Sequence, residues 1–507
     1  MPESNTEDGT LNLHIDEPAG EPAAAAGPET AGDDRRSIYS PLSQFLTRPP
    51  ATCPPGLPVR QALGRLNRLR LGAIVVADPA SGKPLGIFTV PDFIQQAALP
   101  DYDLDQPVER AMTQRFFVLG PEVSAHEAAL TMARQGLRHL LVVGDGKLLG
   151  VVSQRDLFSL PRTGLGELSD DIRIARDIEE LARAAQQIKL LAGRMLRQGM
   201  RAETLTQLVS TLDDLLTIRV IELELDRHTV PEVPMCWIAL GSEGRFEQTF
   251  STDQDNGIIF EPPEEGRTEE IRLGLLPFAR AINQALDACG FPLCRGNIMA
   301  GNPQWCLSLA EWKARFGDWI ISPVPQALLN STIFFDFRGI FGDDTLVQRL
   351  REWVAAVVPG NTLFLRYMAE NALTCAPPLG VIRDFVFDDK AYPHTINLKM
   401  YGSRPFVDAA RVLALAHGVA HTNTAERLRA AAPHIHLAGD DLAALAEAFY
   451  FIQMLRLRQQ MDPATPAGAE NRVNPDRLNQ MERQLLKESF RQAQKLQARL
   501  KPAYGLR

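Results

Sequence analysis

Two aspartates in mid-chain, Asp253 and Asp255, have the residue type and spacing to do chemistry. Asp253 stands eleven residues after Ser242, and both acids lead into an apolar run at 257–260. Because side chains alternate along an extended strand, residues two apart lie on the same face. Two carboxylates on one face repel each other unless a cation lies between them, and such oxygen ligands suit Mg²⁺ or Mn²⁺. The spacing therefore predicts a divalent metal site at Asp253 and Asp255.

A turn that contains two glycines precedes these acids. The string GSEGR at 241–245 follows a short apolar run at 236–240 that reads as a strand. Gly241 lets the backbone approach a phosphate, Ser242 adds a hydroxyl donor, and Arg245 with the turn amides supplies charge and further donors. We therefore expect Gly241, Ser242 and Arg245 to bind the phosphates of a nucleotide.

The string GSEGRFEQTFSTDQDN at 241–256 resembles the catalytic loop of the nucleotidyltransferase superfamily that includes DNA polymerase beta. It is similar to the PII-protein uridylyltransferases, which read Gly-x-Gly-Arg-x-Glu before Ser-Asp-x-Asp. It is closer still to the DUF294 domain, which follows CBS repeats and has its own C-terminal partner domain. The resemblance implies a third metal carboxylate on a neighbouring strand, and a strand predicted at 333–338 carries Asp336. The alternative is that Asp336 pairs with Arg338 on the same face of that strand.

An internal repeat at 61–93 and 128–158 precedes this region. Each copy predicts a helix, an apolar strand, a turn, a second apolar strand and a helix. The second strands end in GIFTVPD and GVVSQRD, and the two copies resemble a tandem CBS pair. In that family the hydroxyl residue meets a phosphate and the following aspartate holds a ribose. The resemblance therefore implies an adenine-nucleotide site at Thr89, Asp92, Ser153 and Asp156. Helix capping by the same four residues is an equally open interpretation.

Composition and periodicity divide the chain into five parts of a multidomain α/β and α protein. Apolar residues at helical spacing between the repeat and the acids, interrupted at Gly199, predict a helical hairpin. The hairpin could join sensor to catalytic domain or simply supply core helices. The predicted parts are a disordered tail (1–36), a tandem CBS pair (37–162), a helical connector (163–230), a polymerase-beta-like nucleotidyltransferase domain (231–345) and a helical C-terminal domain (346–507). We expect a homodimer formed through the CBS pair or the connector.

The composition excludes several other classes of protein. A net charge of −9 and a pI near 5.6, with no basic run, give no field that would gather nucleic acid. Six irregularly spaced cysteines without a CxxC pair indicate buried free thiols in a reducing compartment. The first residues lack the apolar core of a signal peptide, and no apolar run could span a bilayer. We therefore expect a cytoplasmic protein that makes no membrane contact.

The function implied is transfer of NMP from an NTP to an acceptor hydroxyl, with release of pyrophosphate. No His-Asp dipeptide of the kind used by the hydrolase domain of the PII uridylyltransferases occurs, so the acceptor, a regulatory protein or another molecule, is not identified. The alternatives are a non-catalytic adenine-nucleotide sensor and a small-molecule adenylyltransferase. In the C-terminal domain, Lys399, Arg404 and Arg411 could reach a triphosphate or an acceptor, although a network of structural salt bridges is the favoured role. His417, His421, His434 and His436 are expected to be ordinary histidines.

Overall fold

The computed structural model describes residues 40–506, with internal gaps. The gaps fall at 47, 70, 91–92, 94–102, 115, 136, 154–155, 158–164, 252, 265, 381–384 and 388–390. The tail predicted at 1–36 and the predicted ribose ligand Asp92 therefore lie outside the described residues. Within the described part of the chain, no helix combines the length and the apolarity needed to cross a bilayer.

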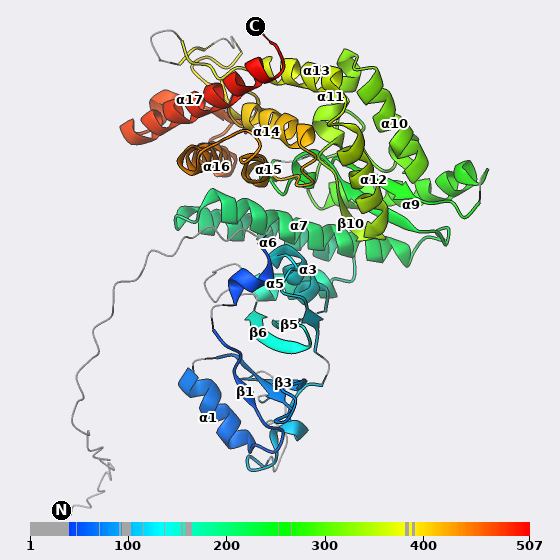
Figure 1. The fold of residues 1–507 in the computed structure, drawn as a ribbon, viewed down its shortest axis with the longest axis vertical. Helices are drawn as coiled ribbons and strands as arrows, with labels where there is room; N and C mark the ends of the chain where they lie inside the picture. The colour runs from blue at the N-terminus through cyan, green and yellow to red at the C-terminus, as the bar shows by residue number, and fades with distance from the viewer. Residues whose placement is uncertain are drawn as a thin grey trace, which may run out of the picture. The chain divides into compact units, whose positions relative to one another are not determined.

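The internal repeat forms two copies of one small α/β unit (Figure 1). In each copy the first strand pairs in parallel with the second, which pairs antiparallel with the third. The registers correspond: Ala73 faces Thr89 in one copy, and His139 faces Ser153 in the other. The elements are η1 (Leu42–Phe45), β1 (Thr52–Cys53), α1 (Val59–Leu69), β2 (Ala73–Ala77), β3 (Pro84–Thr89), η2 (Val108–Arg110), β4 (Val118–Leu119), α3 (Ala125–Gln135), β5 (His139–Gly144) and β6 (Lys147–Ser153).

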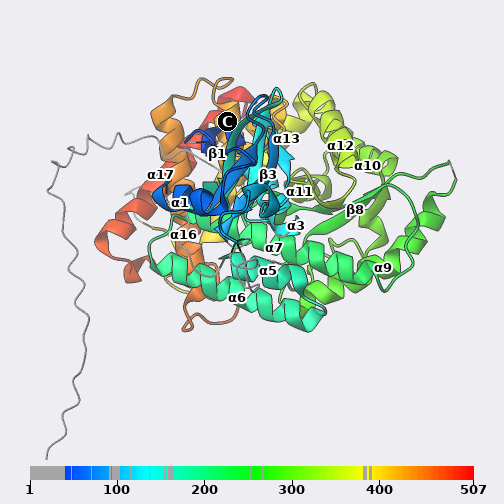
Figure 2. The same cartoon turned by 90° about the horizontal axis from the view of Figure 1, so that it is seen from below.

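Three helices follow: α5 (Leu165–Ile174), α6 (Ile178–Arg197) and α7 (Ala202–Leu225). Asp177 caps α6 by accepting from the amide of Glu180, and Gly199 has the positive φ of 84° that reverses the chain before α7. The helices lie side by side in both ribbon views (Figures 1 and 2). Helix α7 is buried on nearly all its faces and packs against helices and a strand of the later domains. The predicted connector therefore packs as core material of the later domains.

A four-stranded mixed sheet forms the next domain, in the order β10-β7-β8-β9. β7 pairs antiparallel with β8 and β10, whereas β8 and β9 are parallel. Both strands of the central pair are apolar apart from Asn256 and buried apart from Met235, as expected for strands covered on two faces. The elements are β7 (Met235–Ala239), α8 (Gly241–Gly244), β8 (Asn256–Phe260), α9 (Thr268–Ala288), η3 (Pro303–Trp305), β9 (Cys306–Ser308), α10 (Leu309–Ile321), α11 (Pro325–Phe334) and β10 (Arg338–Gly342).

The strand predicted at 333–338 is wrong. Helix α11 runs to Phe334, and strand β10 begins only at Arg338, so Asp336 lies in the turn between them. Aromatic packing decides this: Phe334 contacts the rings of Trp305, Trp312 and Trp319, with ring centroids 4.3–5.9 Å apart. The end of helix α11 places Phe334 among these rings. This packing overrides the local strand propensity of the segment.

The remainder of the chain is mainly helical, as predicted. Proline and capping residues mark its helix starts; Asn423, for example, accepts from the amides of Ala425 and Glu426. A single π-helical turn precedes α14. The elements are α12 (Asp344–Val357), α13 (Thr362–Leu373), β11 (Ile396–Asn397), η4 (Lys399–Ser403), α14 (Arg404–Ala416), α15 (Thr424–Ala431), α16 (Gly439–Met461), β12 (Arg472–Val473), η5 (Pro475–Arg477) and α17 (Gln480–Ala503).

Candidate active site

The glycines of the GSEGR turn are required by the geometry of the backbone. Gly241 follows strand β7 with φ of 58°, and a Cβ there would lie 3.0 Å from Oδ2 of Asp255. Gly244 approaches the chain even more closely, since its Cβ would lie 1.8 Å from the backbone oxygen of Asp336. Both positions therefore exclude larger residues. The turn therefore packs Gly241, the neighbour of Ser242, against the carboxylate of Asp255.

The structure brings Asp253 and Asp255 together at the start of β8, in the extended segment just before the strand. The amide of Leu240 donates to the carbonyl of Asp255 over 2.8 Å, which ties the end of β7 to this segment. This bond places Asp255 beside the GSEGR turn; that Asp253 shares a metal site with it stays a prediction.

A buried amide network fixes the backbone on either side of Asp255. Asn283 donates from Nδ2 to Gln254 Oε1 and to Asn256 Oδ1, each over 2.9 Å. Gln254 in turn donates to the carbonyls of Asn283 and Phe291. Buried hydrogen bonds of this kind are expensive to break, because an orphaned amide would keep its desolvation penalty. The acid is therefore held on a rigid support.

The electrostatics of Asp255 differ from those of a solvated acid. Burial raises the pKa of Asp255 to about 7; the nearby charge of Asp253 adds to the rise, while a hydrogen bond with Cys294 and the charge of Lys399 oppose it. Across the described ranges, neither Asp253 nor Asp255 forms an ion pair, and no cluster of three or more potential metal ligands occurs. Two adjacent carboxylates without a cationic partner fit a divalent cation.

Asp336 is placed quite differently, inside a cage of three arginines. Its side chain is 0% exposed and accepts from Arg411 Nε (2.9 Å) and Nη2 (2.6 Å), Arg427 Nη1 (2.5 Å) and Arg245 Nη1 (2.6 Å). Burial alone would raise the pKa of Asp336, but Arg411, Arg427 and Arg245 outweigh it and hold the pKa well below its usual range. Both oxygens are occupied, so this carboxylate is not available to a metal.

The alternative partner for Asp336 is also wrong. Arg338 instead forms a bidentate ion pair with Asp214 of helix α7, with N–O distances of 2.7 and 2.6 Å. Its guanidinium also stacks over the Phe246 ring, 3.6 Å from the centroid. Asp214 lies 124 residues from Arg338 in the sequence, which is why spacing alone could not identify this pair.

Arg245 is committed to carboxylates, although the sequence predicted a phosphate ligand. Its Nε donates to Glu247 Oε2 over 2.7 Å, and its Nη1 donates to Asp336. Glu247 also accepts from the amide of Thr424, and Asn423 donates to the carbonyl of Arg245. The C-terminal domain therefore fixes the turn that follows Ser242. Sequence reasoning missed Glu247 and Thr424 because this pairing spans 177 residues.

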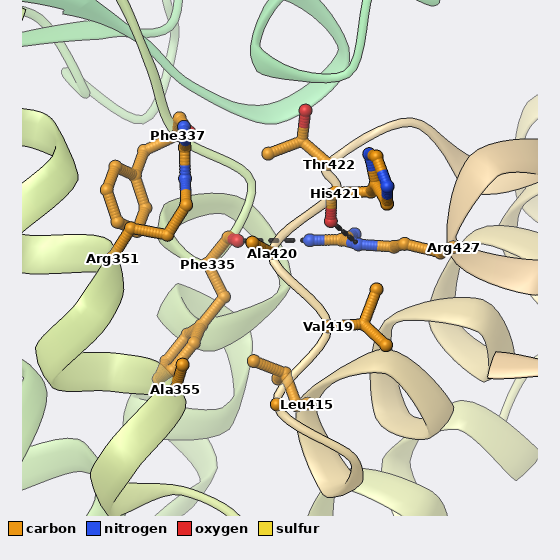
Figure 3. Close-up of a pocket in the computed structure, with 11 residues that line it drawn as sticks. Phe335, Phe337, Arg351, Ala355, Leu415, Val419, Ala420, His421, Thr422 and Arg427 are labelled. Carbon is orange, nitrogen blue, oxygen red and sulfur yellow. Dashed lines mark hydrogen bonds between the residues drawn. The ribbon is translucent and has the colours of Figure 1, made fainter. Parts of the chain in front are cut away.

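Arg427 closes the cage from the far side of Asp336. Figure 3 shows its guanidinium pointing toward the carbonyls of Phe335 and His421, which accept over 3.2 and 2.7 Å. The cavity beside it measures about 30 Å³, which is room for water only. His421 lines this cavity, and His417 stacks on His434 with ring centroids 4.7 Å apart.

A larger cavity of about 140 Å³ opens between the GSEGR turn and the C-terminal domain. Ser242 lies on its wall, together with the polar side chains of Thr249, Ser251 and Thr332. The C-terminal domain contributes seven polar or charged residues: Lys399, Ser403, Arg404, Asp408, Arg411, Gln453 and Arg456. Of these, Arg411 and Asp408 form the structural ion pair that the sequence favoured, with an N–O distance of 2.6 Å.

In the repeat, the hydroxyl and carboxylate of the second copy bind each other. Ser153 Oγ donates to Asp156 Oδ2 over 2.6 Å, and the Asp156 amide approaches Ser153 Oγ at 3.3 Å. This is the capping interpretation of the motif. Thr89 occupies the equivalent position in the first copy, at the end of β3.

Models of known protein families match the CBS pair, the mixed-sheet domain and the C-terminal domain separately. Residues 186–326 match the family described as "Putative nucleotidyltransferase DUF294", and residues 362–504 match the "Putative nucleotidyltransferase substrate binding domain". CBS domains match at 42–98 and 108–162. The chain combines a CBS pair with a DUF294 domain and the C-terminal domain that matches it. The DUF294 match begins inside α6, so it includes α7, which sequence alone had assigned to a connector.

Curated relatives and solved structures cover about a quarter of the chain each. An uncharacterized 17.7 kDa protein of Acidianus ambivalens is 32% identical over 117 residues, 23% of this chain and 70% of that protein. The CBS domain-containing protein YhcV of Bacillus subtilis is 26% identical over 118 residues, 23% of this chain and 83% of that protein. A CBS domain protein of Pyrobaculum aerophilum, complexed with AMP, is 29% identical over 26% of this chain and 98% of its own, with a TM-score of 0.23.

Proposed function

We propose that this DUF294 protein is a metal-dependent nucleotidyltransferase that transfers NMP from an NTP to an acceptor hydroxyl, releasing pyrophosphate. One observation carries the proposal: the carboxylates of Asp253 and Asp255 lie near each other without an ion pair in the described residues, and Asp255 lies against Gly241 of the turn that contains Ser242. The family match supports the same general class of activity.

Asp253 and Asp255 are the residues that would hold the metal, and Asp336 is excluded from this set by its arginine cage. A divalent ion, when bound, would neutralise triphosphate charge and lower the pKa of an attacking hydroxyl. Ser242 offers a hydroxyl donor to a phosphate oxygen at the mouth of the cavity. Asp336 and Glu247 act as positioning residues, because they orient Arg245 and keep the turn in place. In this mechanism the protein contributes mainly by positioning the substrates and by compensating the negative charge of the triphosphate.

The test is transfer of label from each α-labelled NTP, with Mg²⁺ and a cell lysate as the source of acceptor. The wild-type protein should label a macromolecule, whereas Asp253→Asn and Asp255→Asn should each abolish labelling while remaining folded. Asp318→Asn, an exposed acid of helix α10, is the matched control and should leave labelling unchanged. Full labelling by both variants would place the chemistry elsewhere.

We further propose that the CBS pair binds an adenine nucleotide and regulates transfer. The observation that favours it is the shared register, which puts Thr89 and Ser153 at equivalent strand ends of the two copies. Calorimetry of the full chain with AMP, ADP and ATP tests this, with Ser153→Ala as the variant. Loss of AMP binding in that variant supports the proposal. Heat from the wild type without any transfer activity would favour the non-catalytic sensor.

A further inference from the structure

The wall of the 140 Å³ cavity carries an excess of positive charge. Five cationic side chains line it (Arg245, Lys399, Arg404, Arg411 and Arg456) against two carboxylates (Glu247 and Asp408). Asp336 neutralises part of this charge from behind the wall, through Arg245 and Arg411. A positive excess remains even when Asp336 is counted, so the cavity as a whole favours an anion.

The cations differ in how far they are already paired. Arg245 and Arg411 each contact two carboxylates, and their roles are structural. Arg404 contacts one, Asp408, through Nε at 3.0 Å, which leaves its terminal nitrogens without a carboxylate among the described contacts. Lys399 is exposed at the rim and forms no ion pair within the described residues. The free positive charge is therefore supplied by the C-terminal domain.

Arg456 is the most informative of these side chains because it is buried and has only neutral partners. It is 6% exposed, and it donates from Nε to Asn471 (2.9 Å) and from Nη1 to Gln453 (2.6 Å) and Ser403 (3.5 Å). Among the described contacts, no carboxylate lies within ion-pair distance of it. A buried charge without a counterion is strongly unfavourable, so a retained one at a cavity wall indicates an anionic ligand.

The electrostatics of the site agree with this geometry. Burial, together with the neighbouring charge of Arg245, lowers the pKa of Arg456 to about 10, and Glu247 opposes the shift only in part. The backbone at the rim is also irregular, because Lys399 begins the π-helical turn η4 (Lys399–Ser403). Such turns often occur at functional sites.

We propose that Arg456, Lys399 and Arg404 form a polyphosphate-binding subsite, contributed by the C-terminal domain, which binds the β and γ phosphates of the nucleoside triphosphate. The proposal rests on the proposed function for the identity of the ligand. It replaces Arg245, whose guanidinium is already bound by Glu247 and Asp336, as the source of phosphate-binding charge.

Two contacts favour the triphosphate over an anionic group on the acceptor. Ser242 lines the same cavity as Arg456, and its neighbour Gly241 lies against the carboxylate of Asp255. The cationic cavity therefore borders the turn that packs against Asp255.

The experiment measures binding of tripolyphosphate with Mg²⁺ to the full chain by calorimetry, since this probe carries no base and needs no turnover. Arg456→Gln should weaken binding by about tenfold or more, the usual effect of losing a charge-assisted hydrogen bond. Lys399→Gln should weaken it less, because its side chain is exposed. Arg458→Gln is the control on the same helix; Arg458 pairs with Glu482 and should be neutral to binding.

A thermal melt separates a ligand-binding Arg456 from a structural one. Without ligand, Arg456→Gln should melt at the same temperature as the wild type or higher, because a buried charge without a counterion has been removed. Tripolyphosphate should raise the melting temperature of the wild type and not that of the variant. A lower melting temperature with unchanged tripolyphosphate affinity would overturn the subsite.

Competition distinguishes the triphosphate from an acceptor. NTPs should displace tripolyphosphate from the wild type; binding of tripolyphosphate that no NTP displaces would assign the cavity to another anion and overturn the proposal. Failure of the proposed function gives a different result. In that case no NTP is transferred, yet tripolyphosphate binding still depends on Arg456.

Discussion

Replacing Asp336 by asparagine distinguishes a buried structural counterion from a metal ligand. The side chain is 0% exposed and accepts four N–H groups from three arginines. Asparagine has the same shape but no charge, and only one of its terminal atoms can accept. The substitution therefore leaves the guanidinium groups in place and removes the charge that compensates them.

The size of the effect follows from what each arginine retains. Arg245 keeps Glu247 and Arg411 keeps Asp408, with N–O distances of 2.7 and 2.6 Å. Arg427 keeps only the carbonyls of Phe335 and His421 among its described contacts. Breaking a buried ion pair by removing one partner costs about 3–5 kcal/mol, and we expect Asp336→Asn to fall in this range.

The assay is urea unfolding followed by tryptophan fluorescence. All five tryptophans lie between residues 237 and 353, so the signal reports on the mixed-sheet domain and helix α12 and not on the CBS pair. Glu370→Gln, in an exposed pair with Arg366, is the matched control and should cost about 0–1 kcal/mol. If Asp336→Asn unfolds like the wild type and yet abolishes transfer, the reasoning is refuted and Asp336 belongs with the metal-binding acids.

Two further predictions concern the metal-free protein and the turn. The free energy of unfolding of the metal-free protein should fall as pH rises from about 5 to 8. Each carboxyl that holds a proton in the folded state and releases it near pH 4 when unfolded contributes up to about 1 kcal/mol per pH unit. Burial raises the pKa of three such groups: Asp255 to about 7, Asp213 to about 8 and Glu243 to about 8. Urea midpoints measured across this range would contradict the prediction if they stayed level or rose. Gly244→Ala should prevent folding, because the new Cβ would lie 1.8 Å from the Asp336 carbonyl oxygen. Gly199→Ala, where no atom lies within 4 Å, should cost only about 1 kcal/mol, and equal expression and melting of the two variants would show that the close contact relaxes.

Local patterns were enough to predict most individual elements. Strand β7 and the reversal at Gly199 lie within a residue or two of their predicted positions. Each depends on an apolar run or a glycine that acts within a few residues. The strand predicted at 333–338 was wrong because three tryptophans from η3 and α10 hold Phe334 at a helix end.

Part of the candidate site could be predicted from local spacing, and part depends on contacts between distant residues. Gly241, Ser242, Asp253 and Asp255 lie within fifteen residues of one another in the sequence, so their spacing could indicate a shared site. The roles of Asp336 and Arg245 could not be read in this way, since the partners of Asp336 lie 75 to 91 residues away. Residues so far apart in the sequence form ion pairs only when the C-terminal domain packs against the GSEGR turn, and the sequence does not show that packing.

The amino-acid sequence by itself therefore determined the family, the order of the domains and the pair of acids that we propose as the metal site. Repeats and short-range spacing carry that information, because neighbouring residues share an element whatever the rest of the chain does. Only the tertiary structure decided which charges are already neutralised. An arginine in a sequence is a potential phosphate ligand, but burial beside Asp336 commits Arg245, Arg411 and Arg427 to one carboxylate, while Arg456 faces the cavity with neutral partners only. Desolvation makes that difference decisive, because a buried charge must find its counterion within a few ångströms, in the chain or in a ligand.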